Sequence, residues 1–346
     1  MKKIYVLHEF GAISHYYGLI ALAKAHNYDV TFYEFRLYSL LKRTIKGNFS
    51  IIRWVKNVLF LIRLPFIHPS KIVIGTAPFC PYLPLLMFLT KKHEVYHHTS
   101  YTYWDGVTAA HPTNSAKLKK QWKYFTSNYV RHIFTVSDKT KNEIVKYGYS
   151  TPERISVVNH AYNYPIQALE NHVKNNIFIF VGRIVPEKGI HELLQIFASR
   201  SNAKLILIGK GSEESLVQEY SEKYPNIQYI GAIQGLKNII PFYQSASFLI
   251  MNSQRMNAWE ELFGIAIIEG MACGCVPITT DHSGPKEIIT QGQDGILCSE
   301  KHISEGIDKA ISMSNADYQT MRINTINTGK KYTADNIAMR WNAIFS

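Results

Sequence analysis

Two glutamates in the second half of the chain flank a predicted helix start, an arrangement that could bind sugar hydroxyls beside a phosphate. Glu261 and Glu269 stand eight positions apart in WEELFGIAIIEGMACG, which predicts a loop and then a helix that begins near Gly264. Free N–H groups at such a helix start favour phosphate oxygens, and a carboxylate on the helix suits two sugar hydroxyls. The alternative for Glu261 is a helix-start charge favoured by the macrodipole. For Glu269 that alternative is poor, because it lies among apolar residues where an unpartnered carboxylate is costly.

Two cations earlier in the same half predict a diphosphate site. Arg183 and Lys188 stand five apart in FVGRIVPEKG, after an apolar run and before a helix start. Taken alone, such cations also suit a solvated surface. Gly209 in LIGKG marks a second strand-to-helix turn, but the third glycine of a dinucleotide fingerprint is missing. A further glycine turn in VPITTDHSGPKE precedes another helix start.

Alternating strands and helices must position these residues. Apolar runs that predict strands recur through both halves, at Ile4–Leu7, Val30–Tyr33, Ile72–Ile74, Val95–His98, Ile133–Val136, Ile155–Val158, Ile177–Val181, Leu205–Ile208, Ile227–Ile230, Phe248–Met251 and Val276–Thr279. Amphipathic stretches between them predict helices at His15–His26, Ser137–Tyr147, Lys188–Ser199 and Ser304–Met313. This alternation is typical of parallel sheets covered by helices on both faces. About eleven strands fit two doubly wound domains, with the linker at Asn163–Asn176.

The order of these motifs resembles the retaining GT-B glycosyltransferases of the large E-x7-E family (glycosyl transferases group 1, family 4). That family includes sucrose synthases and bacterial mannosyl- and glucosyltransferases. The resemblance is strong over residues 177–300 and loose in the first half. It implies an α/β fold in which two Rossmann-like domains face a central cleft. We expect an acceptor-binding domain at 1–168, a nucleotide-sugar domain at 169–328, and a helix at 329–346 that crosses back to the first domain. The amphipathic pattern of Tyr332–Phe345 agrees with such a helix.

The resemblance also implies residue roles in the second half. Arg183 and Lys188 would hold the donor's diphosphate, with Gly209 on the same donor side. Glu261 would contact the transferred sugar and Glu269 the ribose. Backbone amides of Phe263, Gly264 and Ile265 would meet the sugar and phosphate.

In the first half, the resemblance implies two further contacts to the donor. Gly11 in HEFGA stands where the family has a pair of glycines beside the phosphates. In VYHHT, His98 rather than His97 would face the donor sugar, although a structural histidine pair is the plain alternative. His160 replaces the glycine of the family's P-N-G segment, so the loop there is expected to differ.

A metal is not expected, because no Asp-x-Asp motif occurs. No other cofactor is expected either, since the nucleotide-sugar is a substrate. Arg183, Lys188 and the helix start suit the charge that develops on a leaving phosphate. The resemblance then implies a front-face mechanism with retention, in which that phosphate accepts the acceptor's proton. Zincin, Walker A and G-x-S-x-G motifs are absent from the sequence.

Positive charge is concentrated in the first half. Residues 1–172 hold 22 Lys and Arg against 9 Asp and Glu, whereas residues 173–346 hold 16 against 17. Between Lys42 and Arg63, six cations alternate with apolar and aromatic residues, namely Lys42, Arg43, Lys46, Arg53, Lys56 and Arg63. Such a segment is typical of an anionic membrane surface. A plain solvated helix is one alternative. Single-stranded nucleic acid is another, but no nucleic-acid motif accompanies the cations.

Composition places the protein in a reducing compartment. Four cysteines are too few and too irregular for a disulfide scaffold, and the short apolar run after Met1 is not a signal peptide. Three prolines and a glycine interrupt the uncharged stretch Ile72–Thr90, so we expect a strand, a loop and a helix start rather than a membrane span. The expected location is cytoplasmic and peripheral, on the inner face of the membrane.

The resulting hypothesis is a hexosyltransferase that moves a sugar from a nucleotide-sugar, with UDP favoured, to a lipid-linked or cell-surface glycan. Two other hypotheses remain open. One is a nucleotide-sugar epimerase, against which the E-x7-E spacing argues. The other is a binding protein for sugar or nucleic acid that keeps the fold without catalysis.

Overall fold

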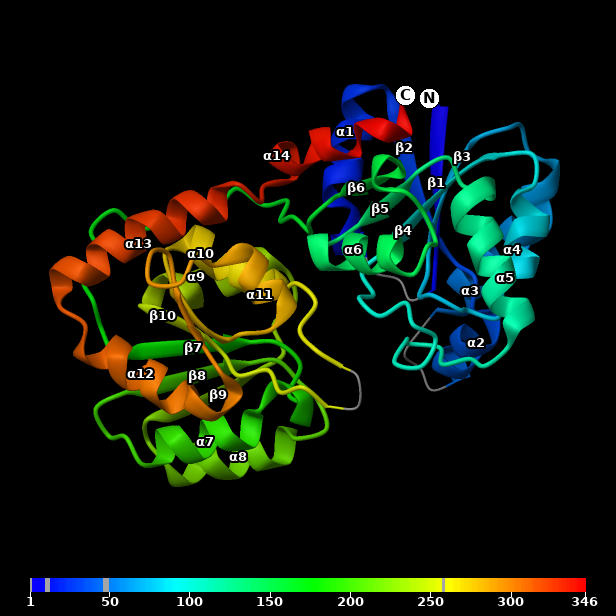
Figure 1. Ribbon diagram of the computed structural model, residues 1–346. Coiled ribbons are helices and arrows are strands. Elements are labelled where there is room, and N and C mark those ends of the chain that lie inside the picture. Colours follow the sequence, from blue (N-terminus) through cyan, green and yellow to red (C-terminus); the bar gives the residue numbers. More distant parts are fainter. Residues whose placement is uncertain (1, 10–12, 46–49, 257–258) are drawn as a thin grey trace. The chain divides into compact units, whose positions relative to one another are not determined.

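Two compact units make up the chain in the computed structural model, which describes residues 2–9, 13–45, 50–256 and 259–346. Unit 1 comprises Met1–Ala161 and Ala334–Ser346, and unit 2 comprises Tyr162–Thr333 (Figure 1). The borders expected at 168 and 329 therefore lie at 161/162 and 333/334. The reason is local: the Tyr162 N–H donates to the Tyr332 carbonyl at 3.1 Å, which ties both ends of unit 2 together.

The six strands of unit 1 form one parallel sheet in the order β2-β1-β3-β4-β5-β6. They are β1 (Lys2–His8), β2 (Tyr28–Glu34), β3 (Lys71–Gly75), β4 (Glu94–Thr99), β5 (Ile133–Thr135) and β6 (Ile155–Val157). All six correspond to strands predicted from the sequence. Central strands such as β3 are nearly continuous apolar runs, because helices cover both faces of the sheet.

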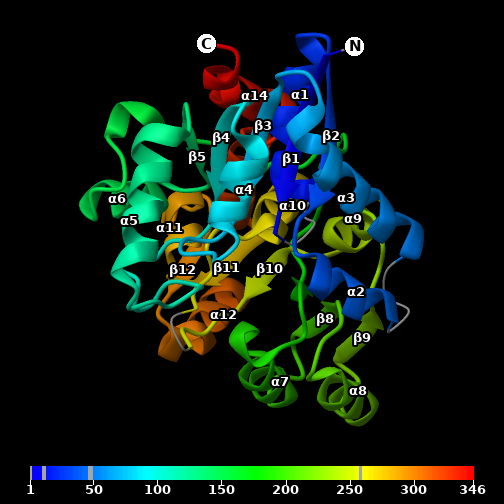
Figure 2. The ribbon, with the colours of Figure 1, turned by 90° about the vertical axis from the view of Figure 1, so that its right-hand side faces the viewer.

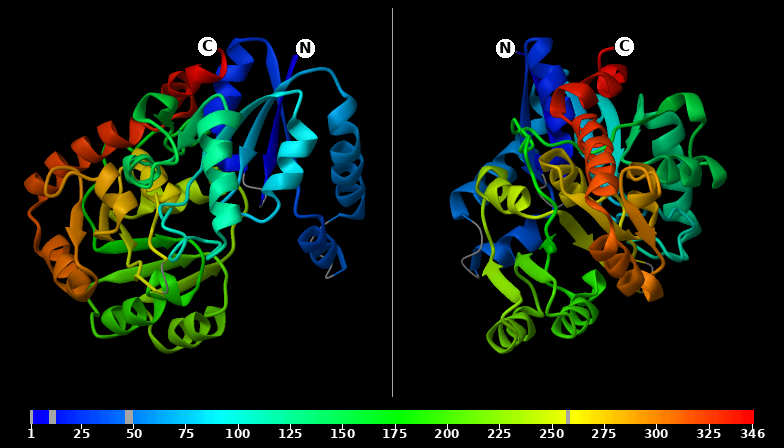
Figure 3. Two further views of the ribbon diagram at one scale, coloured as in Figure 1. Left: turned by 45° about the vertical axis from the view of Figure 1, so that its right-hand side comes forward. Right: turned by 90° about the vertical axis from the view of Figure 1, so that its left-hand side faces the viewer.

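Helices α3 (Ile51–Arg63), α4 (Leu83–Thr90), α5 (Ala116–Tyr124) and α6 (Asp138–Lys146) pack on one face of this sheet. Helix α2 (Leu37–Ile45) lies against α3 beside the edge strand β2 (Figure 2). The other face carries α1 (Tyr17–Ala25) and α14 (Ala334–Ala338), which lie side by side (Figure 3).

The C-terminal segment Ala334–Ser346 packs within unit 1. It is not one α-helix, however: α14 gives way to a 3-10 helix at Met339–Ile344. Ile337 of α14 and Trp341 and Ile344 of the 3-10 helix are all completely buried. Trp341 and Ile337 lie against Gly18 of α1, where a larger side chain would collide with both.

Unit 2 repeats the architecture with the strand order β12-β11-β10-β7-β8-β9. Its strands are β7 (Ile177–Val181), β8 (Lys204–Ile208), β9 (Ile227–Gly231), β10 (Phe248–Met251), β11 (Val276–Thr280) and β12 (Ile296–Cys298). The sequence analysis missed β12. From β9 to β12 the order is that of a Rossmann sheet, 3-2-1-4-5-6.

α-Helices cover both faces of the unit 2 sheet. Helices α7 (Ile190–Ala198), α8 (Glu214–Lys223) and α12 (Ile303–Ser312) share one core, and α9 (Leu236–Ser245) and α10 (Ile265–Cys273) cover the other face (Figure 1). Helix α13 (Asn315–Lys330) packs on α10, and its Tyr318 and Met321 also join the core of α7, α8 and α12. The short α11 (Ser283–Ile288) follows β11. The predicted linker, residues 163–176, contains neither helix nor strand.

The uncharged stretch Ile72–Thr90 forms most of β3, a turn and α4, as expected. Within the described ranges, no helix has both the length and the apolar character needed to cross a membrane.

Candidate functional site

The strand order of unit 2 points to one edge of its sheet. The strand order reverses between the parallel strands β7 and β10, and ligands of such sheets bind outside the carboxyl ends of the strands at this switch point. The segments that leave β7 and β10 there are 182–189 and 252–264. They contain Arg183, Lys188 and Glu261, so the fold brings the residues singled out from the sequence to one place.

Lys188 and Glu261 form a buried ion pair at this edge, between Nζ and Oε2. The Ser253 hydroxyl donates to the same Glu261 oxygen at 3.1 Å, and the Lys188 Nζ lies 5.1 Å from the centre of the Trp259 ring. Both charged side chains are only about a tenth exposed. Without a ligand, the cation expected to meet phosphate and the carboxylate expected to meet sugar thus neutralise each other.

The backbone of Glu261 is fixed by residues that follow β11. Its N–H donates to Nδ1 of His282 at 2.8 Å, and its carbonyl accepts from the Gly284 N–H at 3.1 Å. Because Nδ1 accepts, the neutral ring carries its proton on Nε2 and donates it to Glu300 at 3.1 Å. Burial lowers the pKa of His282, which favours this neutral form. The chain His282–Glu300 therefore orients the Glu261 segment.

Helix α10 begins at the same edge. Its N-cap, Gly264, has φ of +92°, a left-handed conformation that glycine adopts without strain. Phe263 is buried, and its backbone touches Gly284, where a Cβ would come within 2.3 Å of the Phe263 nitrogen. The Ile267 N–H donates to the Gly264 carbonyl at 2.9 Å. The N–H groups before it, of Ile265 and Ala266, precede the helical hydrogen bonds and suit an anion.

Glu269 lies one turn into α10 with a pKa far from the usual carboxyl value. Burial raises its pKa to about 7, and the Tyr243 hydroxyl, 3.4 Å from Oε2, only partly offsets this effect. No cation faces it among the contacts of the described residues. A half-buried carboxyl with one weak hydrogen bond has acceptor capacity left for a ligand.

Arg183 and Gly209 lie on the neighbouring turns after β7 and β8. Arg183 is exposed. Gly209 belongs to a turn that pairs with the Arg183 turn, because the Ile184 N–H donates to the Lys210 carbonyl at 3.0 Å. A Cβ on Gly209 would come within 1.8 Å of the Gly182 carbonyl oxygen. Gly209 therefore permits close packing of the two turns, and nothing shows it contacting a ligand itself.

In unit 1, the switch point between β1 and β3 carries a small cavity. It encloses about 110 Å³ and is lined by His8, Glu9, His15, Gly75, Thr76, His98 and residues 99–101. His98 Nε2 is buried and has no hydrogen-bond partner. Burial and the neighbouring His15, His8 and His97 hold the pKa of His98 well below its usual value, so its ring is neutral.

The two adjacent histidines point to opposite faces of the sheet. His97 points to the opposite face of the sheet, where Nδ1 meets the Ile74 carbonyl at 2.9 Å and Trp122 packs against the ring. His98 lines the cavity instead. His160, which replaces a glycine, stacks on His15 with ring centres 4.1 Å apart.

Glu9 is the main residue that sequence reasoning missed. Its carboxylate is buried next to the cavity and accepts from Arg36 at 3.1 Å, His111 at 2.9 Å and Thr76 at 2.9 Å. Burial opposes ionisation of Glu9, but hydrogen bonds from His111, Ala77 and Thr76 outweigh it and place its pKa below the usual value. Since His111 lies 102 positions away, no local motif could have paired them.

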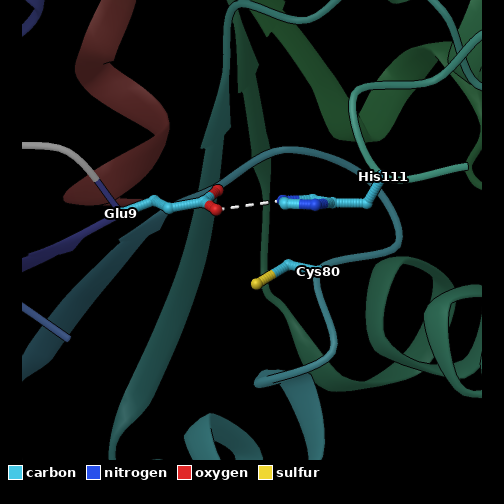
Figure 4. A group of neighbouring side chains, drawn as sticks. All are labelled: Glu9, Cys80 and His111. Atoms are coloured by element: carbon cyan, nitrogen blue, oxygen red, sulfur yellow. Dashed lines mark hydrogen bonds and ion pairs between the residues drawn. The ribbon is translucent and has the colours of Figure 1, made fainter. Parts of the chain in front are cut away.

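The same carboxylate belongs to a group with metal-ligand atoms. Glu9, Cys80 and His111 offer an oxygen, a sulfur and a nitrogen within 4.8 Å of one another (Figure 4). Both Glu9 oxygens already accept hydrogen bonds from the protein, one of them from the Arg36 cation. We therefore describe the group as an ion-pair network and assign no metal to it.

The segment with basic residues forms two helices instead of one. Lys42 and Arg43 lie on α2, and Arg53, Lys56 and Arg63 lie on α3; all five are exposed. Lys46 and Gly11, also expected at functional surfaces, lie outside the described residues.

Comparison with known proteins assigns the second unit. Residues 166–331 match the family model of the glycosyl transferases group 1. This part of the chain belongs to that family. The match spans nearly all of unit 2, including the ion pair, the start of α10 and Glu269.

Curated relatives of the chain agree with this match. The GDP-Man:Man(3)GlcNAc(2)-PP-Dol alpha-1,2-mannosyltransferase of Neurospora crassa is 26% identical over 189 residues, 49% of this chain and 33% of that protein. Across the first four curated relatives, the matched part spans 33% to 62% of the relative's length.

Two solved structures match almost the whole chain, which shows the GT-B fold. The lipopolysaccharide outer core galactosyltransferase WaaB, in its apo form, is 18% identical with a TM-score of 0.69, covering 100% of this chain and 99% of that one. HepE of Anabaena, in complex with UDP, is 14% identical with a TM-score of 0.69, covering 98% of each chain.

Proposed function

We propose that the protein is a retaining glycosyltransferase that moves a hexose-type sugar from a nucleoside diphosphate sugar to a glycan acceptor. The Lys188–Glu261 pair carries the proposal. This pair holds a cation and a carboxylate in contact, at the switch point of a unit that matches the group 1 glycosyltransferases and beside the start of α10, which suits a ligand that carries both phosphate and sugar.

Donor binding would exchange the internal pair for contacts with the ligand. Lys188 would turn to the diphosphate, Arg183 would add a second cation from its exposed turn, and the first N–H groups of α10 would donate to phosphate oxygens. Glu261, released from Lys188, would accept hydroxyls of the transferred sugar.

Glu269 is proposed to hold the ribose. It lies one turn inside α10, so a ribose there would follow phosphates placed at the helix start. UDP is the favoured nucleotide, and the HepE complex contains UDP. The Neurospora crassa relative carries GDP-Man in its name, so the base needs a direct test.

The chemistry needs only groups that hold charge and orient substrates. The bond between the sugar's anomeric carbon and the phosphate oxygen breaks, and the electrons go to the phosphate, where Lys188, Arg183 and the helix start stabilise them. The acceptor oxygen bonds to the anomeric carbon on the same face and gives its proton to the leaving phosphate. We propose that no metal or other cofactor takes part, and that neutral His98 donates to or accepts from a sugar hydroxyl.

The acceptor is proposed to be a lipid-linked or cell-surface glycan that unit 1 binds at the inner face of the membrane. The Neurospora crassa relative is named for a PP-Dol substrate and WaaB for lipopolysaccharide. Five exposed cations on α2 and α3 would attract the anionic headgroups of that membrane.

Nucleotide binding tests the proposal without knowledge of the acceptor. Thermal unfolding is measured with UDP, GDP, ADP and their sugar conjugates, for the native protein and for Arg183→Ala and the exposed control Lys223→Ala. A ligand at 100 times its Kd stabilises by ~2.7 kcal/mol, a shift of roughly 5–10 °C for this size. We expect one nucleotide to give this shift, Arg183→Ala to reduce it and Lys223→Ala to leave it unchanged. Stabilisation by none of them contradicts the proposal.

A further inference from the structure

An apolar pocket in unit 1 lies outside the site described above. It encloses about 340 Å³, within the range of roughly 300–1,000 Å³ that is typical of ligand pockets. Side chains of α2, α3 and α4 and of the residues just before α2 and α4 line it, namely Phe35, Leu37, Tyr38, Val58, Leu61, Ile62, Tyr82, Leu85, Leu86 and Leu89. The lining contains no charged side chain, so the pocket suits a hydrocarbon rather than a sugar or a nucleotide.

The surface around this pocket exposes an unusual amount of apolar side chain. Ten of the nineteen exposed large hydrophobic residues in the described part of the chain belong to residues 37–90: Tyr38, Ile45, Ile51, Ile52, Val55, Leu59, Ile62, Phe66, Leu85 and Phe88. On α3, Val55, Leu59 and Ile62 form one stripe at helical spacing. Apolar side chains gathered in this way mark an interaction surface.

The charge of the same helices identifies the partner's chemistry. Arg53, Lys56 and Arg63 form a basic stripe on α3, next to the apolar one. Sequence positions 35–93 contain no acidic residue. On α2, the Lys42 Nζ lies 4.7 Å from the ring centre of Tyr38, which lines the pocket. A cation therefore lies at the rim of an apolar pocket. An anionic lipid complements both features, because its hydrocarbon chain suits the pocket and its headgroup suits the cation.

We propose that this pocket takes one hydrocarbon chain of an anionic membrane lipid, with Lys42 at the headgroup. Helices α2, α3 and α4 would lie in the membrane interface, their apolar side chains inserted and their cations at headgroup level (Figures 2 and 3). The inference rests on the membrane association proposed above and adds a defined lipid site to it. Neither donor nor turnover enters its test, so its failure would leave the transferase proposal standing.

Titration with a single-chain lipid tests the pocket apart from the surface. The probe is lysophosphatidylglycerol below its critical micelle concentration, followed by calorimetry on the full chain. We expect saturable binding of one lipid per protein. Neutral lysophosphatidylcholine should bind at least fivefold more weakly, and Lys42→Gln should abolish that difference.

Two variants of α4 form a matched pair. Leu85 lines the pocket and Phe88, one turn on, does not; both are exposed, so glutamine at either position is compatible with folding. Leu85→Gln should weaken binding of the single-chain lipid at least fivefold, and Phe88→Gln should change it less than twofold. Val58→Trp, which fills the pocket, should abolish binding, and Val55→Trp, on the exposed stripe, should not.

Flotation with vesicles of phosphatidylglycerol and phosphatidylcholine then tests the surface. Phe88→Gln and Leu85→Gln should both reduce vesicle binding, since both side chains are exposed. No saturable binding of lysophosphatidylglycerol would overturn the proposal. Equal weakening by Leu85→Gln and Phe88→Gln, with unchanged thermal midpoints, would overturn it as well, because it would show adsorption to the surface alone.

Discussion

Breaking the buried ion pair of unit 2 should be costly in a way that a surface pair is not. Lys188 and Glu261 are each about a tenth exposed, and Ser253 is the other hydrogen-bond donor to the paired Glu261 oxygen. Lys188→Met leaves a buried carboxylate with one hydroxyl donor, and Glu261→Gln leaves a buried ammonium group without a counter-charge. Removing one partner of a buried pair costs about 3–5 kcal/mol.

Replacing both partners should cost much less than replacing either. The double variant Lys188→Met, Glu261→Gln has no uncompensated charge, and neutral replacements of buried pairs are often close to neutral in stability. For a unit of this size each kcal/mol shifts the midpoint by about 2–4 °C, so each single variant should lower it by roughly 6–20 °C. The double variant should recover at least half of that loss.

Scanning calorimetry of the full chain measures these midpoints. Lys286→Met is the control, because the Lys286–Asp281 pair, at 3.0 Å in the same unit, is exposed and should contribute under about 1 kcal/mol. Additive losses, in which the double variant loses the sum of the two single losses, would refute the pairing. So would single losses no larger than that of Lys286→Met.

Three other perturbations have defined outcomes. If the ionised Glu269 carboxylate accepts the ribose hydroxyls, its pKa of about 7 predicts that the affinity for the nucleotide rises about tenfold from pH 6 to pH 8. Calorimetric titrations should show this rise in the native protein and a flatter pH profile in Glu269→Gln. A native profile independent of pH would contradict the role. Burial lowers the pKa of His97 to about 4, below its value in the unfolded state, so the unfolded state takes up the proton first as the pH falls. The free energy of unfolding of unit 1 should therefore drop by about 2 kcal/mol between pH 7.5 and pH 5. In urea titrations, His97→Asn should remove this part of the acid sensitivity, and equal sensitivity would show that His97 is not its source. Trp341→Ala should destabilise unit 1 by about 3–5 kcal/mol, because the indole is fully buried beside Phe134 and Gly18; a loss under 1 kcal/mol in the same titration would contradict the packing.

Most of the architecture could be predicted because parallel strands buried on both faces are readable as apolar runs. Eleven of the twelve strands in the described part of the chain follow from such runs, and β12 was missed. The C-terminal segment was expected as a single helix. Its apolar spacing fixes which side chains are buried, but not where an α-helix tightens into a 3-10 helix.

The donor side of the site could be predicted in part, since its residues follow strands within one short stretch of sequence. The Lys188–Glu261 contact joins residues 73 positions apart and appears only when β7 and β10 become neighbours. Support from His282 and Glu300 depends likewise on β11 and β12. Long-range partners of this kind leave no mark on local spacing.

The histidine-lined cavity was the least predictable part. His98 was identified through its strand, but Glu9, Arg36 and His111 converge from three separate segments. For the basic helices, the charge could be predicted from the sequence but the pocket could not. The pocket between α2, α3 and α4 depends on how the helices pack.

Turnover of a nucleotide-sugar is the measurement that tests the central claim most directly. The assay follows release of the nucleoside diphosphate and transfer of labelled sugar to a membrane lipid extract. It compares the native protein with Glu261→Gln and with the exposed control Glu219→Gln, each at a temperature below its thermal midpoint. The account predicts transfer with retained anomeric configuration, a loss of about 10²–10³-fold in Glu261→Gln and no loss in Glu219→Gln. A native protein that binds the nucleotide-sugar without releasing product, or an undiminished Glu261→Gln, would contradict it.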